Sequence, residues 1–322
     1  MEKVLITGIT GQDGLFLTNI LLNDQKDYEI IGISRESNAL EKVQNKLIHI
    51  NKENKNIETV KIIQLDLLNK DHVEKLITDY SPNFVINLSG PSSVYKSLKN
   101  PLIEAEIREI FNNLTSSLIK NRNFAKFYQA SSSEMFGDHS EAINESSLFA
   151  PNSPYAHAKF TNHKKVQEYR KNYSWDIFSG IMFNHESEFR GDDYLIMKII
   201  NSAILIKNKK LNSFSVGSVD YIRDWSYSGD IAKAIYKIIN FGKNDSYVIG
   251  SGTGSKISEI LNIVFKYFNL DWEEHTNIDE KLLRKGDPTK IISNPTLIYK
   301  ELSWETKLNL EDILLKCIKY KL

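Results

Sequence analysis

Residues 3–14 read KVLITGITGQDG, an apolar run that leads into three glycines spaced three apart. Gly8, Gly11 and Gly14 lie between this run and a helical pattern, GLFLTNILL. At a strand-to-helix junction, glycines permit a tight turn, close approach of the backbone to a pyrophosphate and close packing of the helix on the sheet. The helix N-terminus adds free N–H groups and a partial positive charge. We therefore predict a dinucleotide site here, with a tight turn that binds no ligand as the alternative.

Strand and helix patterns alternate outward from this loop. Strand patterns cover 3–8, 29–34, 60–67, 84–89, 124–131 and 176–183, and helical patterns cover about 38–48, 70–80, 101–121 and 153–172. Such alternation predicts βαβ units, and hence a parallel sheet with helices on both faces. Because crossovers between parallel strands are right-handed, we predict the α/β class with a doubly wound Rossmann sheet.

The alternation becomes irregular past residue 184. One helical pattern (228–241) and one strand pattern (246–250) are expected to return to the sheet. We therefore predict an NAD(P)-binding Rossmann domain from 1–184 plus about 220–251. The remainder, about 185–219 plus 252–322, is predicted to form a smaller mixed domain that binds the substrate.

Composition excludes several function classes. Equal numbers of basic and acidic residues, 41 each, leave no net charge to favour nucleic acid or an anionic membrane. No apolar run reaches the roughly 18 residues that cross a bilayer, and the immediate strand pattern leaves no room for a secretory signal. The one cysteine, Cys317, fits a reducing compartment. We expect a cytoplasmic protein without a metal site.

The second and third strand patterns bear on the choice of cofactor. The second ends in GISRES, which places Arg35 and Glu36 beyond the strand. An arginine there suits the 2′-phosphate of NADP, whereas an acid suits the ribose hydroxyls of NAD. Arg35 therefore favours NADP, and Glu36 keeps NAD possible. Asp66 and Leu67 close the third strand pattern, where we expect contact with the adenine.

The stretch SPYAHAK holds a tyrosine and a lysine four residues apart, Tyr155 and Lys159. On a helix this spacing places both on one face. A neighbouring ammonium group favours the phenolate and so lowers the pKa of a tyrosine, which makes it a usable base. Tyr95 and Lys99 have the same spacing, but we expect them in a loop, whereas Tyr155 opens a helix after a Ser-Pro start signal. The pair Tyr155 and Lys159 is therefore the predicted catalytic one.

Several segments together resemble one known family. ITGITGQDG, FYQASSSEMFG, SPYAHAK, MFNHES with the RG that follows, DYIRDW and LSW are similar, in the same order, to segments of the GDP-mannose 4,6-dehydratases. These are extended short-chain dehydrogenases that act on nucleotide sugars, and the matching segments run from about residue 4 to 304. The resemblance implies oxidation of the sugar at C4, loss of water across C5 and C6, and return of hydride to C6. The product is a 4-keto-6-deoxy sugar.

The resemblance also implies catalytic roles. Tyr155 removes the proton from the sugar O4. Glu134 removes the C5 proton, since elimination needs a second base besides the tyrosine. Ser132 stands where the family has a threonine and keeps the hydroxyl that contacts O4, while Ser133 helps the water leave. For Glu134 the alternative is a helix-capping or solvent-facing residue.

Binding residues are carried over in the same way. The cofactor set comprises Gly8, Thr10, Gly11, Gln12, Asp13, Gly14, Arg35, Asp66, Leu67, Leu88, Tyr155, Lys159 and His185. The substrate set comprises Ser92, Ser93, Asn184, Lys198, Arg223 and Arg284. For His185 the alternative is a buried structural hydrogen bond. Lysine is the chain's usual cation, since only seven of its 41 basic residues are arginine, and arginine's planar fork suits phosphate recognition.

Some positions depart from the family pattern. Phe189 stands where an arginine is usual and Pro91 where a glutamine is common, so a GDP-sugar other than GDP-mannose, such as a heptose or an N-acetylated hexosamine, stays open. Arg35 and Glu36 replace two adjacent arginines in a loop that contacts a neighbouring subunit in relatives. We expect a homodimer or homotetramer.

Two other functions remain open. One is a C4 epimerase or 4-dehydrogenase on the same scaffold, which needs Tyr155 and Lys159 but no elimination base. The other is a cofactor-bound regulatory protein without turnover. Glu134 speaks against the first, and the intact set of Ser132, Tyr155 and Lys159 speaks against the second.

Overall fold

The computed structural model describes residues 1–54, 56–283 and 286–322. Its centre is a seven-stranded sheet in which each neighbouring pair of strands is parallel. In order across the sheet, the strands are β10 (Ser246–Ile249), β6 (Ile177–Met182), β5 (Lys126–Ser132), β4 (Phe84–Asn87), β1 (Glu2–Thr7), β2 (Tyr28–Ser34) and β3 (Lys61–Gln64). The chain winds outward from β1 in both directions, which confirms the predicted α/β class and doubly wound sheet.

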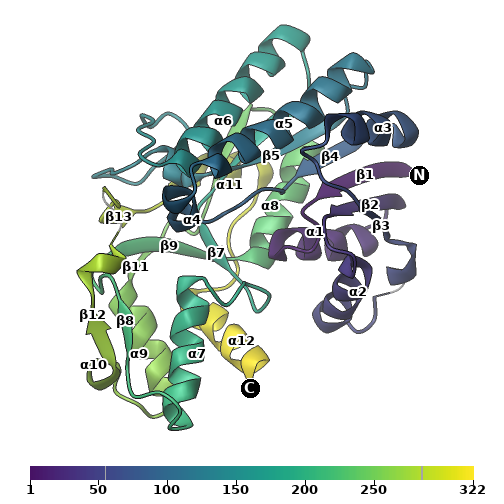
Figure 1. Cartoon of the computed structure of the whole chain (residues 1–322). Coiled ribbons are helices and arrows are strands. Elements are labelled where there is room, and N and C mark those ends of the chain that lie inside the picture. The colour runs from purple at the N-terminus through teal and green to yellow at the C-terminus, as the bar shows by residue number, and fades with distance from the viewer. Residues whose placement is uncertain (55, 284–285) are drawn as a thin grey trace.

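Helices cover both faces of the sheet (Figure 1). One layer holds α1 (Gln12–Leu22), α2 (Ala39–Ile50), α8 (Ser228–Phe241) and α11 (Thr296–Leu302), and the other holds α3 (Lys70–Tyr80), α5 (Leu102–Lys120) and α6 (Pro154–Tyr173). Successive strand residues point to opposite layers: Val4 and Ile6 pack with the first, and Leu5 packs with the second. Both faces are thus buried, as the apolar strands require.

A separate hydrophobic cluster lies away from the central sheet. It packs α7 (Leu195–Lys207), α9 (Ile257–Tyr267) and α12 (Leu310–Lys321) around the side chain of Trp225. Its small sheets join β7 (Asn184–Glu186), β9 (Ile222–Tyr227), β11 (Gly254–Lys256) and β13 (Lys290–Ile291), and pair β8 (Phe214–Val216) with β12 (Thr276–Ile278). Short helices are η1 (Ile57–Thr59), α10 (Trp272–His275) and η3 (Glu280–Leu282).

The segment 220–251 divides between these parts of the fold. Strand β9 pairs with β7, β11 and β13, whereas α8 packs on α1 and β10 joins the edge of the central sheet. The helix and strand predicted to return to the sheet therefore do so. The domain boundaries drawn from the sequence stay a prediction.

Two local predictions need correction. The third strand ends at Gln64, so Asp66 and Leu67 follow it rather than close it. Tyr95 and Lys99 lie on a short helix, α4 (Val94–Lys99), and not in a loop. The helix forms there because the Ser93 side chain accepts a hydrogen bond from the backbone N–H of Lys96 at 3.2 Å, which is a favourable N-cap.

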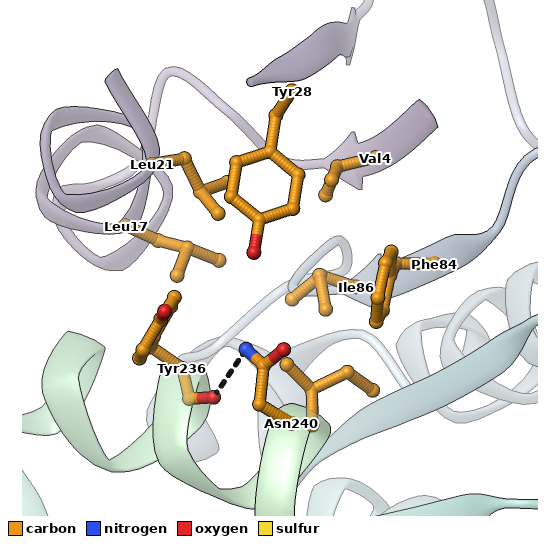
Figure 2. A pocket seen from close by; sticks show the side chains of 9 residues that line it. Val4, Leu17, Leu21, Tyr28, Phe84, Ile86, Tyr236 and Asn240 are labelled. Carbon is orange, nitrogen blue, oxygen red and sulfur yellow. Dashed lines mark hydrogen bonds between the residues drawn. The ribbon is translucent and has the colours of Figure 1, made fainter. Parts of the chain in front are cut away.

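A small apolar pocket lies between α1, α8 and the sheet, lined by Val4, Leu17, Leu21, Tyr28, Phe84, Ile86, Tyr236, Ile239 and Asn240 (Figure 2). The Asn240 side chain donates to the backbone oxygen of Tyr236 at 2.9 Å, so it is used within its own helix. None of the lining residues belongs to the predicted site, so we assign this pocket to core packing. Within the described ranges, no helix is long and apolar enough to cross a bilayer.

Candidate active site

The glycine loop has the geometry of an anion cradle. Gly8 has a φ of +70°, and a Cβ added there would lie 2.9 Å from the backbone oxygen of Leu88. A Cβ on Gly14 would lie 2.7 Å from the Cα of Ile9. Helix α1 begins immediately after Gly11, so its first N–H groups face the turn. Only glycine fits both positions, and the loop fits a dinucleotide pyrophosphate.

The first turn of α1 is fastened to the segment after β6. Gln12 donates through Nε2 to the backbone oxygen of His185 at 3.0 Å and accepts from Ser187 at 2.8 Å. The Asp13 carboxylate contacts His185 Nε2 at 3.1 Å and accepts from the Ser228 hydroxyl at 2.5 Å. His185 therefore makes the structural hydrogen bonds that were the alternative to cofactor binding, and it makes them with residues next to the glycine loop.

These contacts set the ionisation of the buried pair. Burial acts to raise the pKa of Asp13, but His185 and the Ser228 hydroxyl outweigh it and hold that pKa below its usual value. Burial acts to lower the pKa of His185, but Asp13 outweighs it and raises that pKa. The two shifts favour an ionised pair, which ties the cofactor loop to β7.

Tyr155 and Lys159 lie on the first turns of α6, which begins at Pro154. The Lys159 ammonium nitrogen is 5.6 Å from the centre of the Tyr155 ring and donates to the backbone oxygen of Ala130 at 2.8 Å. Burial lowers the pKa of Lys159 to about 8. The predicted pair is thus assembled beside the end of β5, as its helical spacing requires.

The expected fall in the pKa of Tyr155 is not what the structure has. Burial raises the pKa of Tyr155, and the carboxylate of Glu134 raises it further. The Ser132 hydroxyl, hydrogen-bonded to the phenol, and the Arg190 cation both act to lower it. The sequence pattern did not reveal how deeply this phenol is buried, and burial favours its neutral form.

The serines and the glutamate follow β5 directly. Ser132 ends the strand, and Ser133–Met135 form a single 3-10 turn, η2. The Ser132 side chain accepts from the backbone N–H of Glu134 at 3.3 Å, so Ser132 and not Glu134 caps this turn. Glu134 is half-buried and lines a pocket with Val94, Leu98, Asn152, Ser153 and 286–288. The structure thus brings Ser132, Glu134 and Tyr155 together.

The predicted substrate residues lie in two groups. Ser92 is exposed, and its Oγ lies 2.5 Å from the Tyr194 hydroxyl, while Ser93 caps α4. In the second group, Arg223 of β9 is buried and donates to Asp287 at 3.0 Å. Of the others, Asn184 opens β7, Lys198 is exposed on α7, and Arg284 lies outside the described residues.

Residues predicted for the adenosine end lie around the loop after β2. Arg35 contacts the Glu106 carboxylate at 3.2 Å. The Asp66 side chain accepts from the backbone N–H of Leu68 at 3.0 Å, and Leu67 is buried. The Arg35 side chain is 65% exposed, so it can exchange partners at little cost.

Sequence reasoning missed one cation of the site. Arg190 lies in the turn after β7, where its guanidinium is 3.5 Å from the centre of the Tyr194 ring. Its Nε is 3.5 Å from a carboxylate oxygen of Glu186, and its charge acts on both Tyr155 and Asp13. The available signal was an arginine in a loop of a lysine-rich chain, three residues after the end of the FNHES motif.

Phe189, which departs from the family pattern, is buried among aromatic rings. It packs against Phe16 of α1 at 5.6 Å, His49 of α2 at 5.7 Å and Tyr320 of α12 at 5.5 Å between ring centres. The side chain therefore joins the helical layer on the sheet to the C-terminal helix.

Comparison with solved structures identifies the same fold elsewhere. The dTDP-glucose 4,6-dehydratase of Bacillus anthracis, solved with NAD, has a TM-score of 0.82 at 19% identity and covers 99% of this chain and 96% of that one. The UDP-glucose 4-epimerase of Thermotoga maritima, solved with UDP-glucose, has a TM-score of 0.83 at 20% identity, with 99% and 98% covered. At these identities the likeness shows a shared fold.

Sequence comparison is more specific. The family model described as GDP-mannose 4,6 dehydratase matches residues 5–317. GDP-mannose 4,6 dehydratase 2 of Arabidopsis thaliana is 31% identical over 96% of this chain and 84% of its own length. The Vibrio cholerae GDP-mannose 4,6-dehydratase is 28% identical, with 97% and 91% covered. The chain belongs to the GDP-mannose 4,6-dehydratase family.

Proposed function

We propose that this protein converts a GDP-linked sugar to its 4-keto-6-deoxy derivative, with Glu134 as the elimination base and NADP as the cofactor. The observation that carries the proposal is the position of Glu134, one turn beyond β5, where its charge acts on the buried phenol of Tyr155. An enzyme that only oxidises and reduces C4 has no need of a carboxylate there. Membership of the dehydratase family favours elimination over the epimerase and the non-catalytic alternatives.

The glycine loop and the first turn of α1 are proposed to hold the pyrophosphate of the cofactor. Backbone N–H groups at a helix N-terminus bind phosphate oxygens, and the clash that any Cβ on Gly14 would make keeps the backbone accessible. A nicotinamide dinucleotide held there would supply a hydride acceptor for oxidation at C4 and a hydride donor for reduction at C6. The preference for NADP rests on Arg35, whose guanidinium suits a 2′-phosphate and is largely exposed beside Glu106.

Tyr155 is proposed to take the proton from the sugar O4. Burial favours its neutral phenol, so the protein must supply groups that favour the phenolate when the proton moves. The ammonium group of Lys159, the Arg190 guanidinium and the Ser132 hydroxyl are those groups. Because the pKa of Lys159 is about 8, its amine is still mainly protonated at neutral pH.

Glu134 is proposed to take the proton from C5 once C4 is a ketone, because the carbonyl acidifies the neighbouring C–H bond. The electron pair of that bond forms the C5–C6 double bond, and the C6 hydroxyl leaves with one proton as water. Ser133 is buried beside Glu134 in the same turn and is assigned to the leaving hydroxyl. Ser92, Ser93, Asn184, Lys198, Arg223 and Arg284 are proposed to bind the GDP-sugar.

The same proposal includes two domains, of which one binds the cofactor and the other binds the GDP-sugar. It also includes assembly as a homodimer or homotetramer. The separate hydrophobic cluster around Trp225 supports a second domain over the carboxyl ends of the sheet strands. Ligands of doubly wound folds bind at that edge. The aromatic contacts of Phe189 with α1 and α12 support a fixed packing of the second domain on the sheet domain.

The test is mass spectrometry of the protein with NADP and a panel of GDP-hexoses and a GDP-heptose. We expect one member to lose one water with the nucleotide intact, which would also identify the sugar. Loss of two hydrogens, or a C4 epimer at unchanged mass, would support the epimerase or dehydrogenase instead. No reaction with any member would count against the proposal and favour the non-catalytic alternative.

A further inference from the structure

The turn between β7 and α7 carries Tyr194 in a fixed position. The backbone N–H of Tyr194 donates to Gly191 at 3.2 Å, and its oxygen accepts from the N–H of Lys198 at 2.8 Å. The turn is closed further back by a 3.0 Å hydrogen bond from Arg190 N–H to Ser187. Tyr194 thus stands at the first turn of α7, with little freedom of its backbone.

The hydroxyl of Tyr194 reaches the loop that follows β4. Its oxygen lies 2.5 Å from the Ser92 Oγ, and beside it the Lys96 ammonium contacts Asp193 at 2.6 Å. Both contacts join the start of α4 to the turn before α7, and in Figure 1 α4 lies beside α6 on the side that faces α7. The segment around Ser92 is therefore fixed by contacts with the turn before α7.

The same segment is also fastened to the catalytic helix. Ser97 of α4 accepts a hydrogen bond from the backbone N–H of Tyr155 at 3.3 Å, and it is buried there. The Tyr194 hydroxyl is close enough to Tyr155 that a negative charge on it would raise the pKa of Tyr155. A movement of Tyr194 would therefore shift Ser92 and the helix α4, and the hydrogen bond that Ser97 accepts would pass that shift to the backbone of Tyr155.

The ring of Tyr194 has a second use, since it carries Arg190. The guanidinium lies 3.5 Å from the ring centre, a close cation–π contact. Within the described ranges, the buried Nε of Arg190 has no hydrogen-bond acceptor, and its ion-pair partner Glu186 is 3.5 Å away. The aromatic face and the Glu186 carboxylate are therefore two contacts that together set where this cation lies.

We propose that Tyr194 is a positioning residue for the dehydratase reaction: its ring holds Arg190 toward Tyr155, and its hydroxyl holds Ser92 where the sugar binds. This rests on the proposed function, because it gives Tyr155 and the sugar their roles. The charge on Arg190 favours the phenolate that must form at Tyr155. The Ser92 hydroxyl, once ordered, can meet a hydroxyl of the sugar.

Two substitutions separate the hydroxyl from the ring. Tyr194→Phe keeps the ring and removes the contact with Ser92, so KM for the GDP-sugar should rise about two- to tenfold while kcat stays within about twofold. Tyr194→Leu also removes the platform for Arg190, so kcat should fall a further ~10-fold. The acidic limb of its kcat–pH profile should move to higher pH, because the phenolate loses the help of Arg190.

Controls keep the result specific. Tyr95→Phe removes an equivalent hydroxyl from exposed Tyr95 on α4 and should leave KM, kcat and the pH profile unchanged. Ser92→Ala combined with Tyr194→Phe should cost less than the sum of the two single changes, because they share one contact. Equal effects of Phe and Leu at position 194, or additive costs with Ser92→Ala, would overturn the proposal.

The failure of this proposal can be told from failure of the proposed function. A wild-type protein that dehydrates no GDP-sugar contradicts the function itself. The role of the Tyr194 hydroxyl is then measured by calorimetric titration of GDP-mannose into wild-type protein and Tyr194→Phe. Weaker binding by the variant supports the positioning role, and equal binding overturns it.

Discussion

At the scale of single residues, the main feature of the site is that two of its ionisable groups are buried, which disfavours their charged forms. Tyr155 and Lys159 are both buried, and burial favours the neutral form of each. The Ser132 hydroxyl and the Arg190 guanidinium favour the phenolate, Glu134 opposes it, and the Lys159 ammonium lies 5.6 Å from the ring centre. Burial therefore favours the neutral phenol of Tyr155, and in the proposed reaction the Lys159 ammonium helps its proton to leave.

A buried histidine behind the site predicts acid sensitivity. His163 on α6 contacts the Ser179 hydroxyl at 2.8 Å, which in turn donates to Ser131 at 2.8 Å. Burial lowers the pKa of His163 from 6.5 to about 4. In that window the unfolded chain binds more protons than the folded one, so stability present above pH 6.5 is lost as the pH falls toward 4.

Chemical denaturation across this pH range checks the histidine prediction. The wild-type protein should lose on the order of 3 kcal/mol of unfolding free energy through His163 between pH 6.5 and pH 4. His163→Gln should lose less over the same range by about that amount. His157→Gln, on the exposed face of the same helix, should behave as the wild type. Parallel pH curves for wild type and His163→Gln would show that His163 does not titrate in this way.

Much of the residue-level site was accessible from sequence, and the misses have physical causes. The positions of Ser132, Glu134, Tyr155 and Lys159 at a strand end and a helix start were predicted from short motifs, and the structure places them there, while their catalytic roles stay a prediction. The pKa of Tyr155 was misjudged because burial depends on packing that no motif reports. Pairings across the chain, such as Arg223 with Asp287, join residues 64 apart and leave no local signal.

At the scale of elements, the junction of β1 and α1 forms the proposed cofactor site. Its glycines were predicted from the sequence alone, since a positive φ and a close backbone contact both demand glycine locally. The short helix α4 was missed because its signal is one Ser N-cap before six residues without a strong apolar period. The β3 strand was drawn too long because its apolar pattern continues through Leu67, which is buried outside the sheet.

The junction yields a test by substitution. In Gly14→Ala, the new Cβ would lie 2.7 Å from the Ile9 Cα and 2.8 Å from the Gly8 backbone oxygen, so α1 must shift away from the loop. We expect about 1–3 kcal/mol lower stability and at least ~10-fold weaker NADP binding in a calorimetric titration, since displaced N–H groups no longer meet the phosphates.

Val166→Ala is the matched control for that variant. Val166 is buried in the layer on the opposite face of the sheet, so its truncation lowers stability without touching the glycine loop. NADP affinity should be unchanged in Val166→Ala. If Gly14→Ala binds NADP as the wild type does, the loop is a structural turn and the cofactor site lies elsewhere.

At the scale of the whole molecule, the proposed site lies at the carboxyl ends of the central sheet strands. Two layers of helices cover the sheet, and a separate hydrophobic cluster packs beyond it. The proposed catalytic groups come from the end of β5 and the start of α6, and the proposed binding groups come from the loop after β4 and from β7, α7 and β9. The α/β class and the doubly wound parallel sheet were predictable because alternating strands and helices indicate them. The sheets beyond residue 184 were not predicted, since strands of two or three residues carry too short a pattern to read.

The most direct test of the central claim follows one labelled hydrogen. A GDP-hexose that the protein dehydrates is prepared with deuterium at C4 and incubated with wild-type protein and with Glu134→Gln. For the wild type we predict a product that has lost one water and carries the deuterium at C6, while Glu134→Gln binds the sugar but yields almost no dehydrated product. Deuterium returned only to C4 or left on the cofactor, or full water loss in Glu134→Gln, would contradict the account of Glu134 as the elimination base.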